Sequence, residues 1–341
     1  MKKRRKILIY YFGHVGDTLV TYPAFRMIRK NYPDADLILM NHYTTNYPLH
    51  AELFAGDDLF SEVHLLPPPR NLREKLSFYL PFFRLLLKYR FDRVFSFAFN
   101  HEYSKTIAVG SLLFQFKKQE LSQYQESAGG PIYQEYINQL QNSGLTFSEE
   151  IFNFPLTEAE VLTAEKTAEA IQDGSDVPMI AFGIGGKKPA CLWKQENYIQ
   201  LIKLLKTKMD FLPVYTGGPS DRVFAEKLIA SCGGVFLPDT DCKTLREVIA
   251  FYRKCLCYIG NDTGSAHLAG IAGIRCAILY SAHELPEEKW HPVGKGHLFI
   301  RKEVPCAGCR KGICPKESGS CMDLITPEEV MEKVIPWIAT F

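Results

Sequence analysis

Short apolar runs alternate with longer amphipathic segments along the whole chain. The run at residues 7–11 has the length and composition of a buried strand, the segment 18–31 has helical spacing, and an apolar run resumes at 34–40. The second half repeats this alternation, with apolar runs at residues 177–183, 211–215, 255–259 and 274–280. Strands that alternate with helices form parallel sheets covered by helices, so the pattern predicts an α/β fold built from doubly wound sheets.

The length of the chain and its turn residues predict two domains. Its 341 residues are enough for two domains of ordinary size. Residues 157–172 are rich in strong helix formers, and Asp-Gly-Ser at 173–175 ends this helix. We therefore expect the boundary between the two domains to lie between residues 172 and 173.

A strand, a tight turn and a helix follow one another over residues 255–272. The turn is rich in Gly, Asn, Asp and Thr, which favour tight turns and helix caps. A helix N-terminus after a parallel strand offers N–H groups to an anion, so we expect the amides of Thr263, Gly264 and Ser265 to face phosphates. Asp262 would repel a phosphate and is expected to bind sugar hydroxyls. The alternative is an ordinary strand-to-helix loop with a capping aspartate.

A second candidate phosphate site follows the apolar run at residues 177–183. Gly-Gly-Lys-Lys at residues 185–188 combines close backbone approach with ammonium charge at the end of a strand. The spacing is not that of a P-loop. Lys187 and Lys188 are therefore candidate phosphate ligands, and the alternative is a pair of solvent-facing lysines on a loop.

Composition and charge narrow the classes of function. The sequence is 46% hydrophobic with a formal net charge of +2, which does not indicate a nucleic-acid partner. The basic run at residues 2–6 leads directly into the first apolar run, so we expect no secretory signal. No window of about 18 apolar residues is free of charge, so we expect no membrane-spanning helix. These features predict a cytoplasmic protein.

Motifs spread over the chain occur in an order that is typical of one enzyme family. They are Asn-Asp-Thr-Gly-x-x-His-Leu-Ala at residues 261–269, Gly-Asp with a later Pro-Ala at 16–24, Gly-Gly-x-x-Asp at 217–221 and Thr-Pro-Glu-x-Val at 326–330. Together they resemble glycosyltransferase family 9, the lipopolysaccharide heptosyltransferase family. The matches run from residue 6 to residue 330, so the resemblance covers nearly the whole chain.

The resemblance implies a GT-B fold, in which two Rossmann-like domains face a central cleft. Residues 1–172 would bind the acceptor, and residues 173–325, with a cysteine cluster at 306–321, would bind the nucleotide sugar. The last helix, 326–341, would return to the first domain. The implied reaction is an inverting, metal-independent sugar transfer, for which the family's usual donor is ADP-heptose and its usual acceptor the lipopolysaccharide core.

The resemblance also assigns roles to single residues. Asp17 would be the catalytic base, and a carboxylate on a loop at the C-terminal end of a strand does face the crevice where open α/β sheets bind ligands. Asp221 would bind the ribose hydroxyls of the donor. For both aspartates the alternative is a helix cap. Gly16 would lie on the acceptor side, and His267 on the donor side.

The sequence departs from the family at one functional position. Family members carry Lys-x-Trp-Pro before a helix, and this lysine helps to neutralise the donor diphosphate. Here Cys191 stands at the place of the lysine, and Lys194 at the place of the proline. Lys187, Lys188 or Lys194 would have to supply the charge, and the departure leaves the donor sugar open.

The segment before residue 105 holds candidates for contact with the acceptor. Residues 91–97 are strand-like, and the loop after them carries His101 and Glu102, which we take as candidate acceptor ligands. Residues 76–90 are aromatic and apolar with flanking Arg and Lys. This segment is expected to pack on the sheet; the alternative is peripheral contact with the inner face of the cytoplasmic membrane, because family members often act on lipid-linked acceptors.

Four cysteines lie within sixteen residues near the C-terminus, namely Cys306, Cys309, Cys314 and Cys321. Four thiols suit tetrahedral zinc or iron, and some family members bind iron through a similar group. Such a metal would be structural, because four thiolates leave no open position for catalysis. Two disulfides or free thiols are the alternatives.

Other functions remain open within this architecture. A family member could use another nucleotide sugar or a protein acceptor. The same two-domain arrangement could serve a sugar-nucleotide epimerase, which would need acid and base groups around C2 of the sugar. It could also belong to a sugar-nucleotide-binding protein without catalysis.

Overall fold

The structure, a computed structural model, has two compact units, Met1–Ile151 and Phe152–Phe341. It describes residues 4–42, 52–66, 84, 86–89, 91–97, 121–123, 130–283, 287–316 and 319–341. The predicted acceptor candidates His101 and Glu102, and most of the aromatic segment 76–90, lie outside these ranges. No helix among the described residues is long and apolar enough to cross a membrane.

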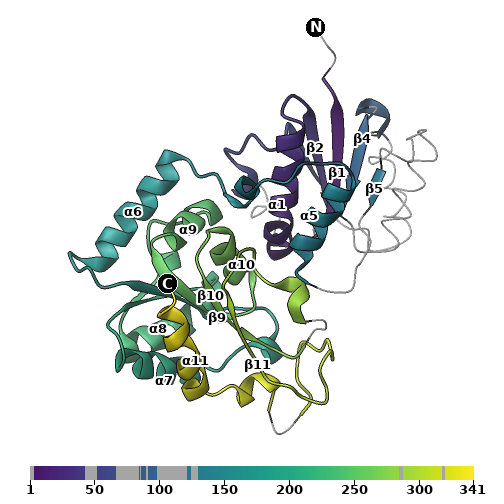
Figure 1. The fold of residues 1–341 in the computed structure, drawn as a ribbon. Coiled ribbons are helices and arrows are strands. Elements are labelled where there is room, and N and C mark those ends of the chain that lie inside the picture. Colours follow the sequence, from purple (N-terminus) through teal and green to yellow (C-terminus); the bar gives the residue numbers. More distant parts are fainter. Residues whose placement is uncertain are drawn as a thin grey trace. The chain divides into compact units, whose positions relative to one another are not determined.

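The first unit is built on a parallel sheet with the strand order β3-β2-β1-β4-β5. Its strands are β1 (Lys6–Phe12), β2 (Asp36–His42), β3 (Glu62–Leu66), β4 (Arg93–Ser96) and β5 (Leu121–Gln123). Helices α1 (Val15–Asn31) and α5 (Ile132–Asn142) pack against each other in this unit (Figure 1). The central strand β1 is buried because its side chains are apolar on both faces.

The second unit contains a six-stranded parallel sheet with the order β11-β10-β9-β6-β7-β8. The strands are β6 (Met179–Gly183), β7 (Leu212–Thr216), β8 (Val235–Phe236), β9 (Cys255–Asn261), β10 (Cys276–Tyr280) and β11 (Leu298–Arg301). The helices are α6 (Glu158–Gln172), α7 (Gln195–Lys206), α8 (Arg222–Cys232), α9 (Leu245–Tyr252), α10 (Gly264–Ile271) and α11 (Pro327–Ile338). Helices α7, α8 and α11 cover one face of the sheet, and α6, α9 and α10 lie on the other (Figure 1). The two parallel sheets confirm the predicted α/β class.

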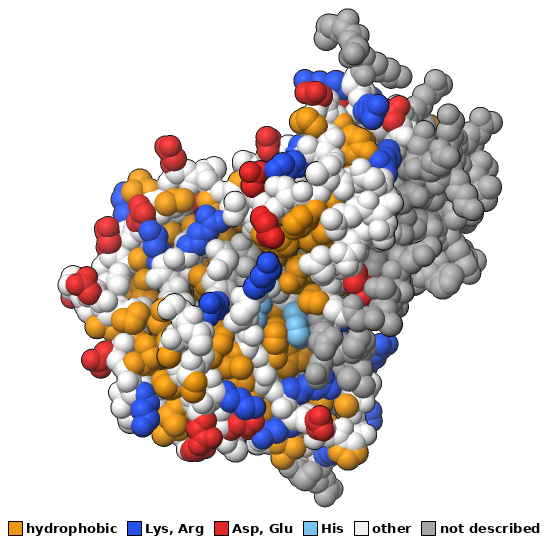
Figure 2. All heavy atoms as spheres, viewed as in Figure 1, with side chains coloured by type: hydrophobic (Ala, Val, Ile, Leu, Met, Phe, Trp, Pro, Cys, Tyr) orange, Lys and Arg blue, Asp and Glu red, His pale blue; other side chains and the backbone are white. Residues whose placement is uncertain are grey.

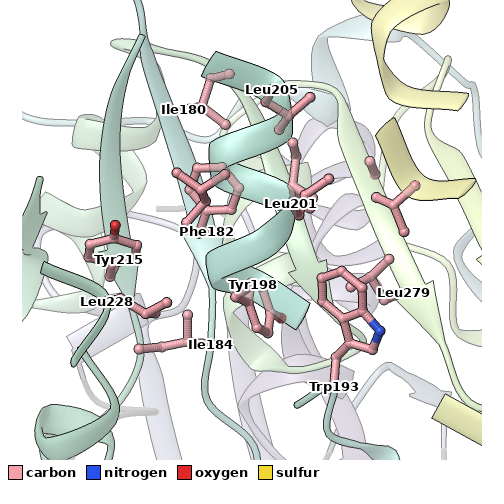
Figure 3. Close-up of a cluster of buried hydrophobic side chains, with 14 of the residues drawn as sticks. Ile180, Phe182, Ile184, Trp193, Tyr198, Leu201, Leu205, Tyr215, Leu228 and Leu279 are labelled. Carbon is pink, nitrogen blue, oxygen red and sulfur yellow. The ribbon is translucent and has the colours of Figure 1, made fainter. Parts of the chain in front are cut away.

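The core of the second unit lies between its sheet and helix α7. Figure 3 shows Leu201 and Leu205 of α7 beside Phe182 and Ile180 of β6, and all four side chains are fully buried. The 3.6-residue period of α7 brings its apolar positions onto the sheet. This packing fixes the strand ends from which the candidate site is built.

The division into units differs from the predicted domain boundary after residue 172. Helix α6 packs on α9, and the buried guanidinium of Arg246 in α9 bonds Glu160 of α6 and the carbonyl of Pro155. The contacts therefore place residues 152–172 in the second unit. The last helix was predicted to return to the first domain, but Val330 and Val334 of α11 belong to the core of the second unit.

Candidate functional site

The loops after β6, β7 and β9 meet at the C-terminal edge of the second sheet. Gly185 and Gly186 follow β6, and they lie between the turn after β7 and the start of α10. A methyl group on Gly185 would lie 2.2 Å from Asp221 Oδ2, and one on Gly186 would lie 3.2 Å from Thr263 Cγ2. A methyl group on Gly185 would overlap the Asp221 carboxylate, and one on Gly186 would lie only 2.4 Å from Leu192 Cδ2, so glycine is favoured at both positions. The structure thus brings together three of the motifs that the sequence separates by up to 78 residues.

The carboxylate of Asp221 caps its own turn. Its Oδ2 accepts a hydrogen bond from Gly218 N at 2.8 Å, directly before α8. Asp221 is the N-cap residue of α8, but its side chain makes no capping hydrogen bond to that helix and instead caps the preceding 3-10 turn, Pro219–Asp221. Binding of ribose hydroxyls by the same side chain stays a prediction.

The N-terminus of α10 follows β9 as the sequence predicted. Thr263 is the N-cap residue, and Gly264, the first helical residue, is exposed. The hydroxyl of Ser265 is bonded beneath the loop to Tyr252 and Thr216, so its side chain serves packing. What this terminus presents is its backbone N–H groups, which have no partner inside the helix. Asp262, just before the N-cap, is half-buried.

His267 lies in the first turns of α10 and is buried. Burial lowers its pKa to about 4, with further lowering from the charges of His291 and His297. The imidazole is therefore neutral at pH 7. Its Nε2 lies 3.9 Å from Asp262 Oδ1, and its Nδ1 has no hydrogen-bond partner among the described residues.

The three candidate lysines have different surroundings. Lys188 Nζ lies 2.9 Å from His283 Nε2, and Lys194 forms a 2.8 Å ion pair with Asp323. Lys187 is exposed. The thiol of Cys191, which stands where the family has a lysine, has a pKa raised by partial burial, so it stays uncharged at pH 7. Sequence reasoning could not find the Lys188–His283 contact, because the two residues are 95 positions apart.

The cysteine-rich loop, residues 306–321, packs on the same edge of the sheet. Its backbone N–H groups at Gly308 and Arg310 donate to the carbonyls of Ala282 and His283, at 2.8 and 3.0 Å. All ten cysteines of the chain are free thiols, so the predicted disulfide alternative is wrong. Within the described ranges no three Cys, His, Asp or Glu side chains are gathered as a metal site would need, and the metal centre stays a prediction.

The thiols differ in exposure. Cys309 is exposed, whereas Cys255 and Cys257 of β9 and Cys276 of β10 are buried in the second sheet. Burial raises the pKa of these three thiols. They are therefore inert packing residues in the folded protein.

Asp17, the candidate base, lies in the first unit. Helix α1 begins at Val15, three residues before the helical pattern of the sequence, so Gly16 and Asp17 both belong to its first turn. Asp17 Oδ2 accepts a hydrogen bond from His14 N at 2.7 Å. The carboxylate therefore helps to cap α1, and it is half-exposed at the C-terminal side of β1.

The surface in Figure 2 shows Lys and Arg side chains interspersed with Asp and Glu and with apolar areas. At the candidate site, two sources of positive charge are the side chain of Lys188 and the N-terminus of α10.

A family model described as glycosyltransferase family 9 (heptosyltransferase) matches residues 133–318. None of the curated proteins matches the sequence. The structure is similar to that of a family 9 glycosyl transferase from Veillonella parvula DSM 2008, with a TM-score of 0.73 and 17% identity, covering 100% of this chain and 99% of that one.

Two heptosyltransferases from E. coli have a similar structure. The ADP-heptose LPS heptosyltransferase II has a TM-score of 0.66 and 18% identity, over 98% of this chain and 99% of its own. A heptosyltransferase solved with ADP-2-deoxy-2-fluoro heptose has a TM-score of 0.62 and 16% identity, over 97% and 99%. At these identities the likeness shows the fold, which confirms the predicted GT-B class.

Proposed function

Because the chain belongs to glycosyltransferase family 9, we propose that it is an inverting glycosyltransferase that takes its sugar from a nucleotide-sugar donor. The observation that carries this proposal is the meeting of three loops at one edge of the second sheet. The Gly185–Gly186 backbone there separates the carboxylate of Asp221 from the N-terminus of α10. Ligands of open α/β sheets bind at this edge.

The donor would lie across these loops. The N–H groups of Thr263, Gly264 and Ser265 would bind the diphosphate, because a helix N-terminus favours negative charge. Asp221 would accept hydrogen bonds from the ribose, and Asp262 and neutral His267 would contact the sugar. These assignments are supported by the chemistry of each group and by its place in the fold.

Asp17 would act as the base on the acceptor. Its carboxylate takes the proton of an acceptor hydroxyl, whose oxygen forms a bond to the anomeric carbon from the face opposite the diphosphate. The bond between that carbon and the diphosphate oxygen breaks, and the nucleoside diphosphate leaves with the bonding electrons. Fixed N–H groups and a lysine supply the positive charge that the leaving group needs, so the proposed reaction requires no metal.

The donor we favour is ADP-heptose, with a lipopolysaccharide core or related glycan as acceptor. This choice is supported by the family and by the solved E. coli relative that holds an ADP-heptose analogue. The protein would then work in the cytoplasm, in peripheral contact with a membrane that carries the acceptor. Because Cys191 stands where family members have a lysine, other nucleotide sugars should be tested as donors as well.

The proposal is tested by incubating the protein with ADP-heptose, UDP-sugars and GDP-sugars and measuring the release of nucleoside diphosphate. Transfer predicts release that depends on an added glycan acceptor. Interconversion of the donor without acceptor would instead identify an epimerase. Binding of the donor without turnover under any condition would identify a protein that has lost catalysis.

Substitution of Asp17 tests the mechanism separately. Asp17→Asn and Asp17→Ala remove the base, so we expect kcat to fall by about 100-fold or more. The Kd for the donor should change less than threefold, because the donor groups lie in the second unit. Asp17→Asn keeps much of the shape of the side chain and controls for loss of the cap. Turnover at the wild-type rate in both variants would show that Asp17 is not the base.

A further inference from the structure

Lys188 and His283 form a bridge at the edge of the second sheet. Lys188 follows β6 and His283 follows β10, and these two strands lie on either side of β9. The 2.9 Å contact between Lys188 Nζ and His283 Nε2 therefore joins the loops that flank the end of β9. Helix α10 begins at that end, so the ammonium and the helix N-terminus belong to one edge of the sheet.

The chemistry of this contact differs from that of Lys194. An ammonium group has only donors, so His283 Nε2 must accept and the ring proton must lie on Nδ1. A neutral acceptor orients the ammonium without adding negative charge. Lys194 instead pairs with the carboxylate of Asp323, which keeps the pKa of Lys194 above its usual value. The two contacts therefore differ in the chemistry of the partner: Lys188 donates to an imidazole nitrogen, whereas Lys194 pairs with a carboxylate.

The cysteine-rich loop holds the backbone of His283 and the backbone two residues after Lys188. Its Gly312 carbonyl accepts a hydrogen bond at 3.0 Å from Ala190 N, two residues after Lys188. Its Arg310 N donates to the carbonyl of His283 itself, and Cys321 Sγ accepts from Ala282 N at 3.2 Å. His283 is buried, with 7% of its surface exposed. The buried imidazole is therefore a fixed acceptor for the exposed Lys188 side chain, and an ammonium that is oriented before binding loses less entropy when an anion binds.

We propose that Lys188, positioned by His283, is the side chain that neutralises the diphosphate of the donor, in place of a lysine at position 191. The inference rests on the proposed function and names the cation of its donor site. The uncharged thiol of Cys191 does not oppose an anion there. Lys194 has a structural role, tying the start of α7 to Asp323.

The test compares the binding of ADP and of adenosine by titration calorimetry. Lys188→Ala should weaken ADP binding by about tenfold or more, because one ionic contact to a phosphate is lost, and should leave adenosine binding unchanged. Lys187→Ala is the matched control, since it removes an adjacent exposed ammonium, and should change ADP binding less than twofold. Lys194→Ala should lower the melting temperature with little effect on ADP binding.

His283 is a positioning residue, and its test uses rescue. His283→Ala should weaken ADP binding by a smaller factor than Lys188→Ala does. The double variant Lys188→Ala/His283→Ala should bind ADP about as weakly as Lys188→Ala alone. His283→Gln offers an amide oxygen that accepts from the ammonium, so it should restore part of the affinity.

The outcomes separate this inference from the proposed function. Wild-type protein that binds no ADP, UDP or GDP would refute the proposed function and the inference with it. Wild-type protein that binds ADP, with a folded Lys188→Ala variant that binds it equally well, would overturn the inference alone. Equal losses for ADP and adenosine would also overturn it, because they would indicate a general change of the site.

Discussion

At the scale of single residues, the candidate site depends on glycines, which have no side chain, as much as on its polar side chains. Gly185 and Gly186 let the loop after β6 approach its neighbours because they have no side chain, whereas Gly264 in the first turn of α10 faces open space. The sequence predicted these positions from their glycines and from the family motifs. It could not predict that Ser265 would bond Tyr252 and Thr216, because that contact depends on packing.

Gly264→Ala tests the amide site without disturbing the fold. A methyl group at this position would meet no atom within 4 Å, so stability should be unchanged or raised by up to about 1 kcal/mol. The methyl group would occupy space beside the helix N-terminus, and the Kd for ADP should rise tenfold or more. Gly312→Ala, where the surroundings are equally open, is the control for both measurements. Unchanged ADP affinity in Gly264→Ala would contradict phosphate binding at α10.

The buried histidines predict a pH dependence of stability. His267 and His291 both have a pKa lowered to about 4, first by burial, whereas a histidine in an unfolded chain titrates near 6.5. Their stabilising effect is therefore complete above about pH 6.5 and is lost as the pH falls toward 4. The fully buried His267 should cost about 2 kcal/mol of unfolding free energy by pH 5, and the partly exposed His291 should cost less because solvent screens its charge.

Chemical denaturation at pH 7.5 and pH 5 measures this loss. His291 stacks on Phe299 with ring centroids 3.5 Å apart, and His291→Gln should lose less stability between the two pH values than the wild type. Equal losses in the two proteins would show that His291 does not titrate in this way.

At the scale of elements, loops far apart in the sequence are tied to one another. The sequence predicted most strands and helices by their period, but it missed three short strands, β5 of three residues, β8 of two and β11 of four. Short strands carry little periodic signal. It read the turn after Gln172 correctly as a helix end, but the partner of Arg246 lies 86 residues away, and only the structure shows that α6 packs on α9.

Arg246→Ala should destabilise the second unit. The Arg246 side chain is 3% exposed and forms an ion pair with Glu160, so its removal leaves buried acceptors unpaired and should cost about 3 kcal/mol. Lys254→Ala breaks the more exposed pair with Glu165 and should cost less than about 1 kcal/mol. Both values can be measured by denaturant titration. Equal, small effects would contradict the role of Arg246 as the anchor of α6.

At the scale of the whole molecule, the two compact units show which residues belong to the same folded part of the chain. The family motifs predicted two α/β domains and their order, and the contacts move the division to residue 151. The turn at 173–175 marks the end of a helix and not the end of a domain, because Ala164 and Ala168 of α6 are buried in the second unit. Turn residues signal local structure and carry no information about such packing.

Fragments of the chain test this division. Residues 152–341 should fold alone with a cooperative thermal transition, because they include α6 and its contacts. Residues 173–341 lack Glu160 and Thr167, the partners of Arg246 and Cys242, and should melt at a lower temperature or fail to fold. Circular dichroism measures both transitions. A 173–341 fragment as stable as 152–341 would restore the boundary predicted from the sequence.

Because some cysteines are exposed and others are buried, the rates at which they react can report how often the second sheet opens. A reagent such as iodoacetamide would add its mass to Cys309 in the intact molecule. It would reach Cys255, Cys257 and Cys276 only while the strands of the second sheet are separated. Mass spectrometry of the digested chain would then give two labelling rates. The rate at these three buried thiols reports opening of the second sheet, and the rate at Cys309 reports the reactivity of an exposed thiol in the folded protein.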